Sequence, residues 1–275
     1  MWFFNSIFGK IFEFIFIPFS KMNPWIGMAV ASFLTGIFML AIFRWTSNQE
    51  GIRNVKNKIK AHLLEIRLYK DNLSLSLKAQ GNILRYNLKY VGYSAKPMVF
   101  MIIPIVLIII QLNFWFGYES LSKGQNFILK VKLKQGYNPL HTNIVLKPSS
   151  GIIIETPPLR IEEEGEIDWR LAVAEEGSSN LQILVNGQSA IKTLTVSQNS
   201  ICRISPIKVQ HNIFQEILYP GEPPIKKDIP IQSIEIKYPQ KRMNLFGWHI
   251  HWIIAYFILS IIFGFAFKGF LKVEI

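Results

Sequence analysis

Residues 97–118 read PMVFMIIPIVLIIIQLNFWFGY, and no charged side chain interrupts this run. Residues 24–43 (PWIGMAVASFLTGIFMLAIF) and 243–267 (MNLFGWHIHWIIAYFILSIIFGFAF) are uncharged in the same way. A helix needs about 20 residues to cross the hydrocarbon core of a bilayer, at a rise of ~1.5 Å per residue. The three runs therefore predict transmembrane helices over 24–45, 97–118 and 243–267.

The charge distribution predicts the orientation of these spans. Residues 44–96 contain 11 Lys or Arg and three acids, which is eight of the chain's twelve excess positive charges. The positive-inside rule places this segment in the cytosol and the N-terminus outside. Residues 119–242 are then extracytoplasmic, and the tail 268–275 is cytosolic. We expect an integral protein of the bacterial inner (cytoplasmic) membrane. The basic excess is a topology signal beside anionic lipid, so no sequence-specific nucleic acid partner is expected.

The N-terminal segment is apolar but contains two charges. Lys10 and Glu13 lie three residues apart and share a helix face, whereas phenylalanines and isoleucines occupy another face. We expect residues 1–23 to form an amphipathic helix in the outer membrane interface, ended by Pro18. The alternative is a fourth span that enters from the cytosol, after which the chain returns through residues 18–23.

Residues 46–96 have the apolar periodicity of a cytosolic helical hairpin. A narrow seam of the coiled-coil kind is expected between two arms, with a hinge at Asp71-Asn72. The first arm contributes Ile52, Val55, Ile59, Leu63, Ile66, Tyr69 and Leu73, and the second contributes Leu77, Ile83, Leu84, Asn87, Leu88 and Val91.

The outer faces of this hairpin are basic. Solvation beside lipid headgroups explains such a face, and a docking surface for an anionic partner such as the ribosome or another membrane subunit is the alternative. The residues concerned are Lys56, Lys58, Lys60, Arg67, Lys70, Lys78, Arg85 and Lys89.

Between 119 and 242 the pattern changes to short alternating runs separated by Pro, Gly, Ser and Asn. This spacing predicts an extracytoplasmic antiparallel β-sandwich, with Trp169 in its core and a hairpin turn at Asn186-Gly187. Residues 219–242 are rich in proline and predict an extended return to the membrane. The expected strands are 127–133, 143–147, 152–155, 159–162, 167–174, 181–185, 190–196 and 201–204.

The sequence contains no persuasive catalytic or metal-binding constellation, so we expect no enzyme activity, no cofactor and no metal. Polar residues inside the spans are sparse. They are expected either to bond their own backbone and neighbouring helices, or to line a partly hydrated groove that lowers the cost of moving polar chain through lipid. The candidate groove residues are Ser32, Thr35, Gln111, Asn113 and Ser260, with Arg44 at the cytosolic end.

The order of these segments resembles the YidC/Oxa-type membrane protein insertase superfamily, particularly the branch with the catalytic subunit of the ER membrane protein complex and its archaeal relatives. The likeness is carried by residues 48–116, with LYKDN at the hinge and YNLKYVGYSAKPMVFMIIP leading into the second span, and by GWHIHWIIAYFILSIIFGFAFKG near the C-terminus. Two features depart from the family. A β-rich domain replaces the transmembrane hairpin of the bacterial members, and Arg44 is the only candidate for the groove arginine that many of them carry.

The resemblance implies an insertase or chaperone that moves transmembrane segments of nascent or unfolded membrane proteins into the bilayer through a shallow hydrophilic groove. The alternative function is a structural or scaffolding membrane subunit whose β domain binds an extracytoplasmic partner.

Overall fold

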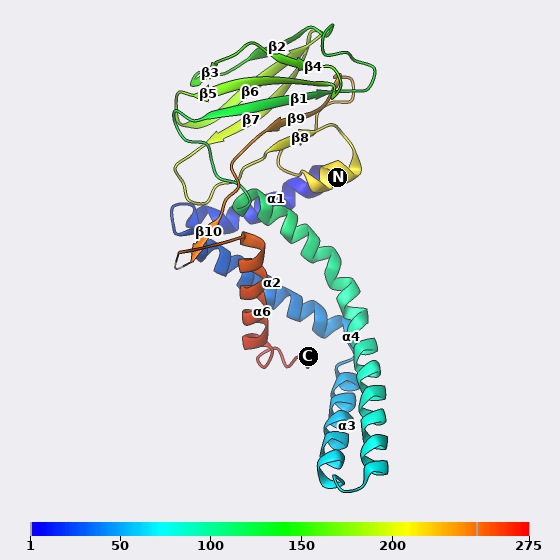
Figure 1. Cartoon of the computed structure of the whole chain (residues 1–275). Coiled ribbons are helices and arrows are strands. Elements are labelled where there is room, and N and C mark those ends of the chain that lie inside the picture. The colour runs from blue at the N-terminus through cyan, green and yellow to red at the C-terminus, as the bar shows by residue number, and fades with distance from the viewer. Residues whose placement is uncertain (1, 246, 275) are drawn as a thin grey trace. The chain divides into compact units, whose positions relative to one another are not determined.

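The computed structural model describes residues 2–245 and 247–274, and the chain divides into two compact units. The first unit comprises Met1–Gly27 and Leu107–Trp252, and the second comprises Met28–Val106 and Ile253–Ile275. The helices are α1 (Trp2–Phe16), η1 (Ile17–Phe19), α2 (Pro24–Thr46), α3 (Gln49–Leu68), α4 (Leu73–Phe116), α5 (Ile213–Leu218) and α6 (Trp252–Phe267) (Figure 1).

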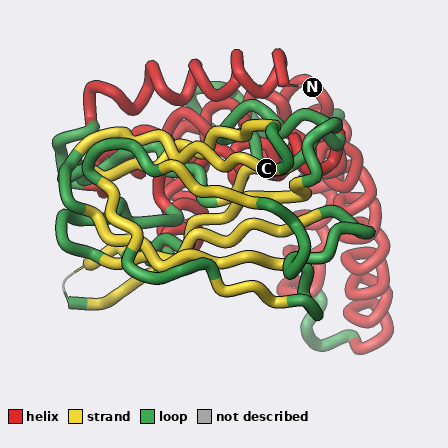
Figure 2. The backbone as a smooth tube through the Cα atoms, turned by 90° about the horizontal axis from the view of Figure 1, so that it is seen from above, coloured by secondary structure: helices red, strands yellow, loops and turns green. Residues whose placement is uncertain are grey.

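The first unit contains an antiparallel β-sandwich, as the alternating pattern predicts. One sheet has the order β3-β5-β1-β9-β8, with β4 also paired to β5, and the other has the order β2-β6-β7. Figure 2 shows the strands in yellow. The strands are β1 (Asn126–Leu133), β2 (Ile144–Lys147), β3 (Ile152–Ile154), β4 (Leu159–Ile161), β5 (Glu166–Val173), β6 (Gly177–Val185), β7 (Gln188–Val196), β8 (Ile207–Val209) and β9 (Ile231–Ile236).

The inward-facing residues of both sheets form one apolar core. Trp169 of β5 is buried in it, as expected, beside Leu129 of β1 and Ile183 of β6. The β6–β7 hairpin turns at Asn186 and Gly187, whose φ angles of 48° and 82° fit the type I′ turn that an Asn-Gly pair favours. The alternation of buried and exposed residues thus determines which face of each sheet enters the core.

Two expectations for the β region were wrong. Residues 201–204 are not a strand, because their backbone groups bond elsewhere: Ile201 N donates to Ser20 O and Ile204 N donates to Phe114 O. The segment 219–242 is not merely an extended return either. It contains β9, which lies between β1 and β8 and buries Ile231, Ile234 and Ile236.

The N-terminal helix α1 packs within the first unit through one face. Phe12 and Phe16 are buried, and the Phe16 ring contacts the rings of Trp115 and Phe116 at the end of α4. The Asn5 side chain donates to the Glu216 carbonyl on α5 at 2.7 Å. Apolar residues on another face of α1, including Phe14, stay exposed. This amphipathic pattern suits a helix at an interface.

The predicted third span begins later than expected. The strands β10 (Met243–Leu245) and β11 (Trp248–Ile250) pair antiparallel where the helix was expected to begin. The Trp25 indole N–H donates to the carbonyl of Asn244 at 2.7 Å. The helix α6 therefore starts at Trp252 and has 16 residues.

In the second unit, α2 and α6 approach each other closely at two glycines. A Cβ atom on Gly36 would lie 3.1 Å from the carbonyl of Ser260 and 3.3 Å from the amide of Gly264. Next to this contact the Phe33 ring makes edge-to-face contacts with Phe263 and Phe267. Small residues of this kind permit two helices to pack closely.

The helical hairpin forms from α3 and the first part of α4. The arms contact each other where the His62 ring of α3 stacks on the Tyr86 ring of α4, with 5.5 Å between the ring centres. Of the α3 half of the predicted seam, Ile52 and Val55 are buried, but Ile52 is buried in a cluster with Leu40, Phe43 and Val273.

The α4 half of the predicted seam was wrong. Apart from Ile83, which is half-buried, its residues are exposed, because α4 turns another face toward α3. The helix also continues through Pro97 and Pro104, so the expected boundary between arm and span lies inside one helix of 44 residues. The exposed residues of the predicted seam include Leu63, Tyr69, Leu73, Leu77, Leu84, Leu88 and Val91.

Candidate functional site

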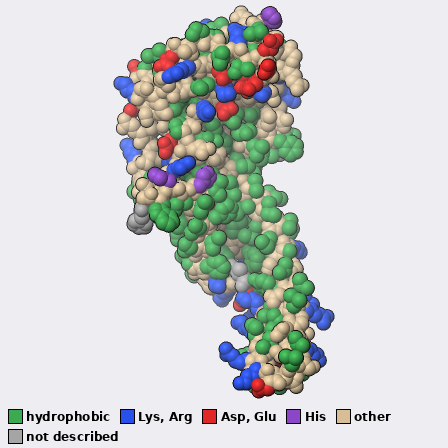
Figure 3. All heavy atoms as spheres, viewed as in Figure 1, with side chains coloured by type: hydrophobic (Ala, Val, Ile, Leu, Met, Phe, Trp, Pro, Cys, Tyr) green, Lys and Arg blue, Asp and Glu red, His purple; other side chains and the backbone are tan. Residues whose placement is uncertain are grey.

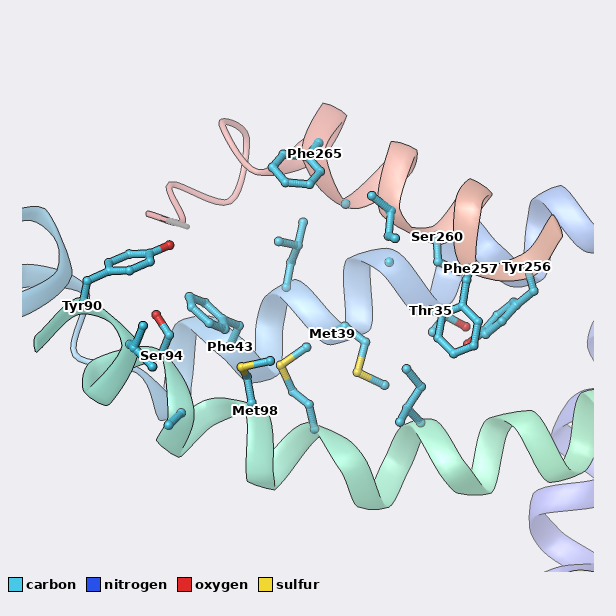
Figure 4. A pocket seen from close by; sticks show the side chains of 18 residues that line it. Thr35, Met39, Phe43, Tyr90, Ser94, Met98, Tyr256, Phe257, Ser260 and Phe265 are labelled. Carbon is cyan, nitrogen blue, oxygen red and sulfur yellow. The ribbon is translucent and has the colours of Figure 1, made fainter. Parts of the chain in front are cut away.

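The candidate site is a partly open cavity of about 620 Å³ within the second unit, here called the hydroxyl cavity (Figure 4). Three helices line it with one face each, at the three- and four-residue steps of an α-helix. The lining residues are Thr35, Gly36, Met39, Leu40 and Phe43 of α2, Tyr90, Val91, Ser94, Ala95, Met98, Met101 and Ile105 of α4, and Tyr256, Phe257, Ser260, Ile261, Gly264 and Phe265 of α6.

The close packing of α2 on α6 builds one side of the cavity. Gly36 and Gly264 both line it, so the helix contact made by these glycines also determines its width. Met98 and Met101 stand on the opposite side, on α4. Methionine side chains are flexible and polarisable, so this wall can adapt to differently shaped apolar groups.

Polar groups occur at both ends of the cavity. Thr35, Tyr256 and Ser260 gather at one end, whereas Tyr90 and Ser94 lie at the other (Figure 4). The remaining lining is apolar, and none of the lining residues carries a charge. The cavity can therefore offer hydroxyl groups, but no ion pair, to an occupant.

Three of these hydroxyls lack a partner with good hydrogen-bond geometry among the described residues, although all are buried from solvent. They are the Oγ atoms of Ser94 and Ser260 and the phenolic oxygen of Tyr256. The Tyr256 hydroxyl does have the hydroxyls of Thr35 and Ser260 as neighbours. Buried polar groups in folded proteins are nearly always bonded, so unsatisfied ones that line a cavity are available to an occupant.

The cavity contains two of the predicted groove residues, Thr35 and Ser260. Ser32 does not line it. Its side chain is fully buried and donates to the Tyr256 carbonyl at 3.3 Å, the helix-bonding role that was the alternative for these residues. Arg44 is also outside the lining, since its Nη1 donates to the Leu271 carbonyl at 2.9 Å.

Gln111 and Asn113 belong to the first unit and are not among the lining residues. Gln111 is buried and its Oε1 has no partner among the described residues. Asn113 is half-buried, and its carbonyl accepts from the amide of Gly117 at 2.9 Å.

Sequence reasoning missed Ser94 and Tyr256. Ser94 precedes the apolar run and falls in the predicted cytosolic arm, and Tyr256 falls in the predicted third span without being singled out. A usable signal was the spacing of Ser94, Met98 and Met101, which places all three on one face of a helix that continues through Pro97.

The predicted basic face lies along the hairpin, where Figure 3 shows lysines and arginines gathered on the surface. Most of its members are exposed. Lys56 is half-buried and pairs with Glu274 at 3.1 Å, and the ammonium groups of Lys58 and Lys89 lie 5.2 and 5.6 Å from the centre of the Tyr86 ring. The exposed members are Lys58, Lys60, Arg67, Lys70, Lys78, Arg85 and Lys89.

No model of a known protein family matches the chain, and no curated protein sequence matches it. Among solved structures, domains 4 and 5 of the S-layer protein SbsC align with a TM-score of 0.23 and 21% identity, over 29% of this chain and 47% of that one. The SbsC fragment rSbsC(31-844) aligns with a TM-score of 0.23 and 17% identity, over 34% of this chain and 13% of that one. Domains 5-6 of SbsC give a TM-score of 0.24 and 13% identity, over 44% and 58%. This chain thus spans less than half of the first structure, and scores this low carry no argument about fold or function.

Proposed function

We propose that this protein is a membrane protein insertase, in which the hydroxyl cavity receives polar chain while an adjoining transmembrane segment moves into lipid. The observation that carries this function is the cavity itself: buried hydroxyls without good partners, set among apolar and methionine side chains, on three apolar helices. Such a lining offsets part of the cost of dehydrating polar chain, which is the main obstacle to insertion.

Membrane placement is supported by what the helices expose. Residues 98–106 of α4 include six large apolar side chains that are exposed: Met98, Val99, Phe100, Ile102, Ile103 and Val106. On α6, Ile254, Ile258 and Ile262 are exposed as well. Soluble proteins rarely expose such continuous apolar surface, whereas lipid requires it. Both α2 and α4 also have the length and composition to cross a bilayer.

The length of α6 supports a locally thin bilayer. Sixteen residues form a helix of about 24 Å, compared with a hydrocarbon core of about 30 Å. A span that is too short is accommodated by thinning of the surrounding bilayer. A thinner bilayer beside the cavity shortens the apolar path that a polar segment must cross.

An exposed apolar stripe on α4 supports entry from the cytosolic side. The stripe residues recur at steps that keep them on one side of the helix, and the last of them, Val91, also lines the hydroxyl cavity. A row of cations, Lys78, Arg85 and Lys89, follows a neighbouring side of the helix. The stripe consists of Leu73, Leu77, Leu84, Leu88 and Val91, all exposed.

The absence of charge in the cavity lining determines the proposed client class. Hydroxyl groups donate to and accept from amides, hydroxyls and backbone groups, but they do not neutralise a carboxylate. We therefore expect clients whose translocated tails are short, polar and uncharged. No cofactor and no covalent step is required.

The test is to remove the cavity hydroxyls without changing its shape. A combined Ser94→Ala, Tyr256→Phe and Ser260→Ala variant should insert a client with a polar uncharged tail about tenfold more slowly in proteoliposomes, the equivalent of one or two lost hydrogen bonds. A client with an apolar tail should be less affected. Ser32→Ala is the matched control, since that hydroxyl is buried outside the cavity. Equal insertion of both clients by the triple variant and the wild type would refute the role of the cavity.

A scaffolding subunit remains the second candidate, and one observation favours it. Strands β3 and β4 pair with successive parts of β5 and expose Ile153 and Leu159, at 56% and 62% of their surface, opposite Ala172 and Asp168. Clustered exposed apolar residues on a folded domain indicate a protein contact. For a scaffold, the triple hydroxyl variant works normally, whereas Ile153→Lys with Leu159→Lys abolishes function.

A further inference from the structure

A second cavity, of about 690 Å³, lies where the start of α3 meets the segment after α6; we call it the basic cavity. Four cationic side chains line it: Arg53, Lys56, Lys268 and Lys272. The carboxylates in its lining are Glu50 and Glu274. All of these residues belong to the second unit, and none of them lines the hydroxyl cavity.

The wall formed by the segment after α6 is held in place by specific contacts. The guanidinium of Arg44 donates to the Leu271 carbonyl, and the amide of Glu274 donates to Oε1 of Gln49 at 2.7 Å. Val273 is buried in a cluster with Leu40, Phe43 and Ile52. These contacts bind the segment to the end of α2 and the start of α3, so the basic cavity is formed before any ligand arrives.

The described lining of the basic cavity has four cations and two carboxylates, so two of its positive charges are not balanced. Lys56 and Glu274 form an ion pair with each other, and the pKa of Glu274 is lowered by the hydrogen bond and charge of Lys56 and further by the charges of Arg53 and Lys60. Among the described residues, the side chains of Arg53, Lys268 and Lys272 make no ion pair, although the Lys268 ammonium lies 5.2 Å from the Phe265 ring centre. Three cations thus face one remaining carboxylate, that of Glu50.

Lys272 occupies an unusual backbone conformation. Its φ angle is 50°, in the left-handed region that lysine rarely adopts, and its amide donates to the Gly269 carbonyl at 3.1 Å. Such a conformation costs free energy and persists only where the surroundings hold it, often at functional sites. This turn places Lys272 in the lining of the basic cavity, together with Arg53 and Lys268.

Two aromatic residues close in sequence to the lining of the basic cavity indicate what kind of anion it meets. Trp45 ends α2 and Phe270 follows α6, and both are more than 80% exposed. Exposed aromatic rings at the ends of apolar helices are typical of the membrane interface. On the membrane placement proposed above, the cavity is at the level of lipid headgroups, on the side where the positive-inside rule places the cytosol.

We propose that the basic cavity binds the phosphate group of an anionic phospholipid of the cytoplasmic leaflet. The planar guanidinium of Arg53 suits two phosphate oxygens, while Lys268 and Lys272 provide point charges. Bound lipid would join the ends of α2 and α6 to the start of α3. This binding site does not depend on insertion activity.

The test measures the thermal stability of the full-length protein, by intrinsic fluorescence, in vesicles of phosphatidylcholine with and without phosphatidylglycerol. Phosphatidylglycerol should raise the melting temperature, and removing one cation should weaken its binding about five-fold. The variants are Arg53→Gln and Lys272→Gly; the latter removes a charge while glycine accepts the positive φ, so misfolding does not explain a loss. Lys78→Gln, on the distal part of the hairpin, and Lys272→Arg are the controls.

The outcomes separate the possible ligands. Stabilisation by phosphatidylglycerol that is reduced in Arg53→Gln and Lys272→Gly, but retained in both controls, supports the site. An equal reduction in Lys78→Gln shows only general attraction to a charged surface and overturns it. If inorganic phosphate stabilises the detergent-solubilised protein as strongly as the lipid does, the lipid source is overturned in favour of a soluble phosphate.

Discussion

Ser32 and Thr35 stand three residues apart on α2, yet their hydroxyls have different surroundings. Ser32 bonds to a carbonyl of α6, whereas Thr35 lines the hydroxyl cavity beside Tyr256. Both were expected in the groove, since a sequence gives the depth of a residue in a helix but not the rotation of that helix against its neighbours. In the β-sandwich, the partner of Lys192 could likewise not be predicted from the sequence. The sequence predicted a strand over 190–196, but nothing indicated that Glu222, thirty residues after Lys192, would bond to it.

The buried pair of Lys192 and Glu222 leads to a prediction at this scale. Lys192 is fully buried, so desolvation lowers its pKa, and Glu222 and the Ser205 carbonyl are its partners. Glu222→Gln leaves a buried charge without its counter-ion and should destabilise the β-sandwich by about 3–5 kcal/mol in denaturant unfolding. Lys192→Met combined with Glu222→Gln should recover most of that loss. A single variant as stable as the wild type would show that the pair is not buried as described.

At the scale of elements, α4 shows what periodicity can and cannot decide. Its apolar positions predicted a helix correctly, but two stripes of similar spacing compete for the partner face. The structure packs Ala79 and Tyr86 against α3 and leaves Leu77 and Leu84 exposed. Which stripe packs against α3 was not predictable, because Pro97 was expected to separate the hairpin arm from the second span. In a helix that continues through Pro97, the exposed stripe leads to the lining residues Val91, Ala95 and Met98.

The hairpin prediction compares a buried position on α3 with an exposed position on α4. Val55→Asp places a charge in the packed seam and should separate the arms, so that proteolysis at the Asp71-Asn72 turn becomes faster. Leu84→Asp is the matched control: it adds the same charge at an exposed position and should leave proteolysis unchanged. If Leu84→Asp opens the hairpin as well, α4 packs against α3 through the originally predicted seam instead.

The two units differ in how much of their structure the sequence could predict. In the β-sandwich, seven of the eight expected strands are present, because alternation and turn residues are local signals. The eighth segment, 201–204, is not a strand because its amides donate to the carbonyls of Ser20 and Phe114. Strand β9 was not predicted because it lies in a segment rich in proline. In the helical unit, apolar runs predicted the helices well. The hydroxyl cavity depends instead on long-range packing at Gly36 and Gly264, which only the fold reveals.

The most direct test of the central claim is photo-crosslinking from α4 to a client caught during insertion. Met98 and Ile103 are matched positions, because both are exposed apolar residues of the same helix, at 60% and 68%, but only Met98 lines the hydroxyl cavity. A photoreactive amino acid at Met98 should crosslink to the client segment, and one at Ile103 should crosslink to lipid alone. Equal client crosslinking from both positions, or none from Met98, would contradict the account.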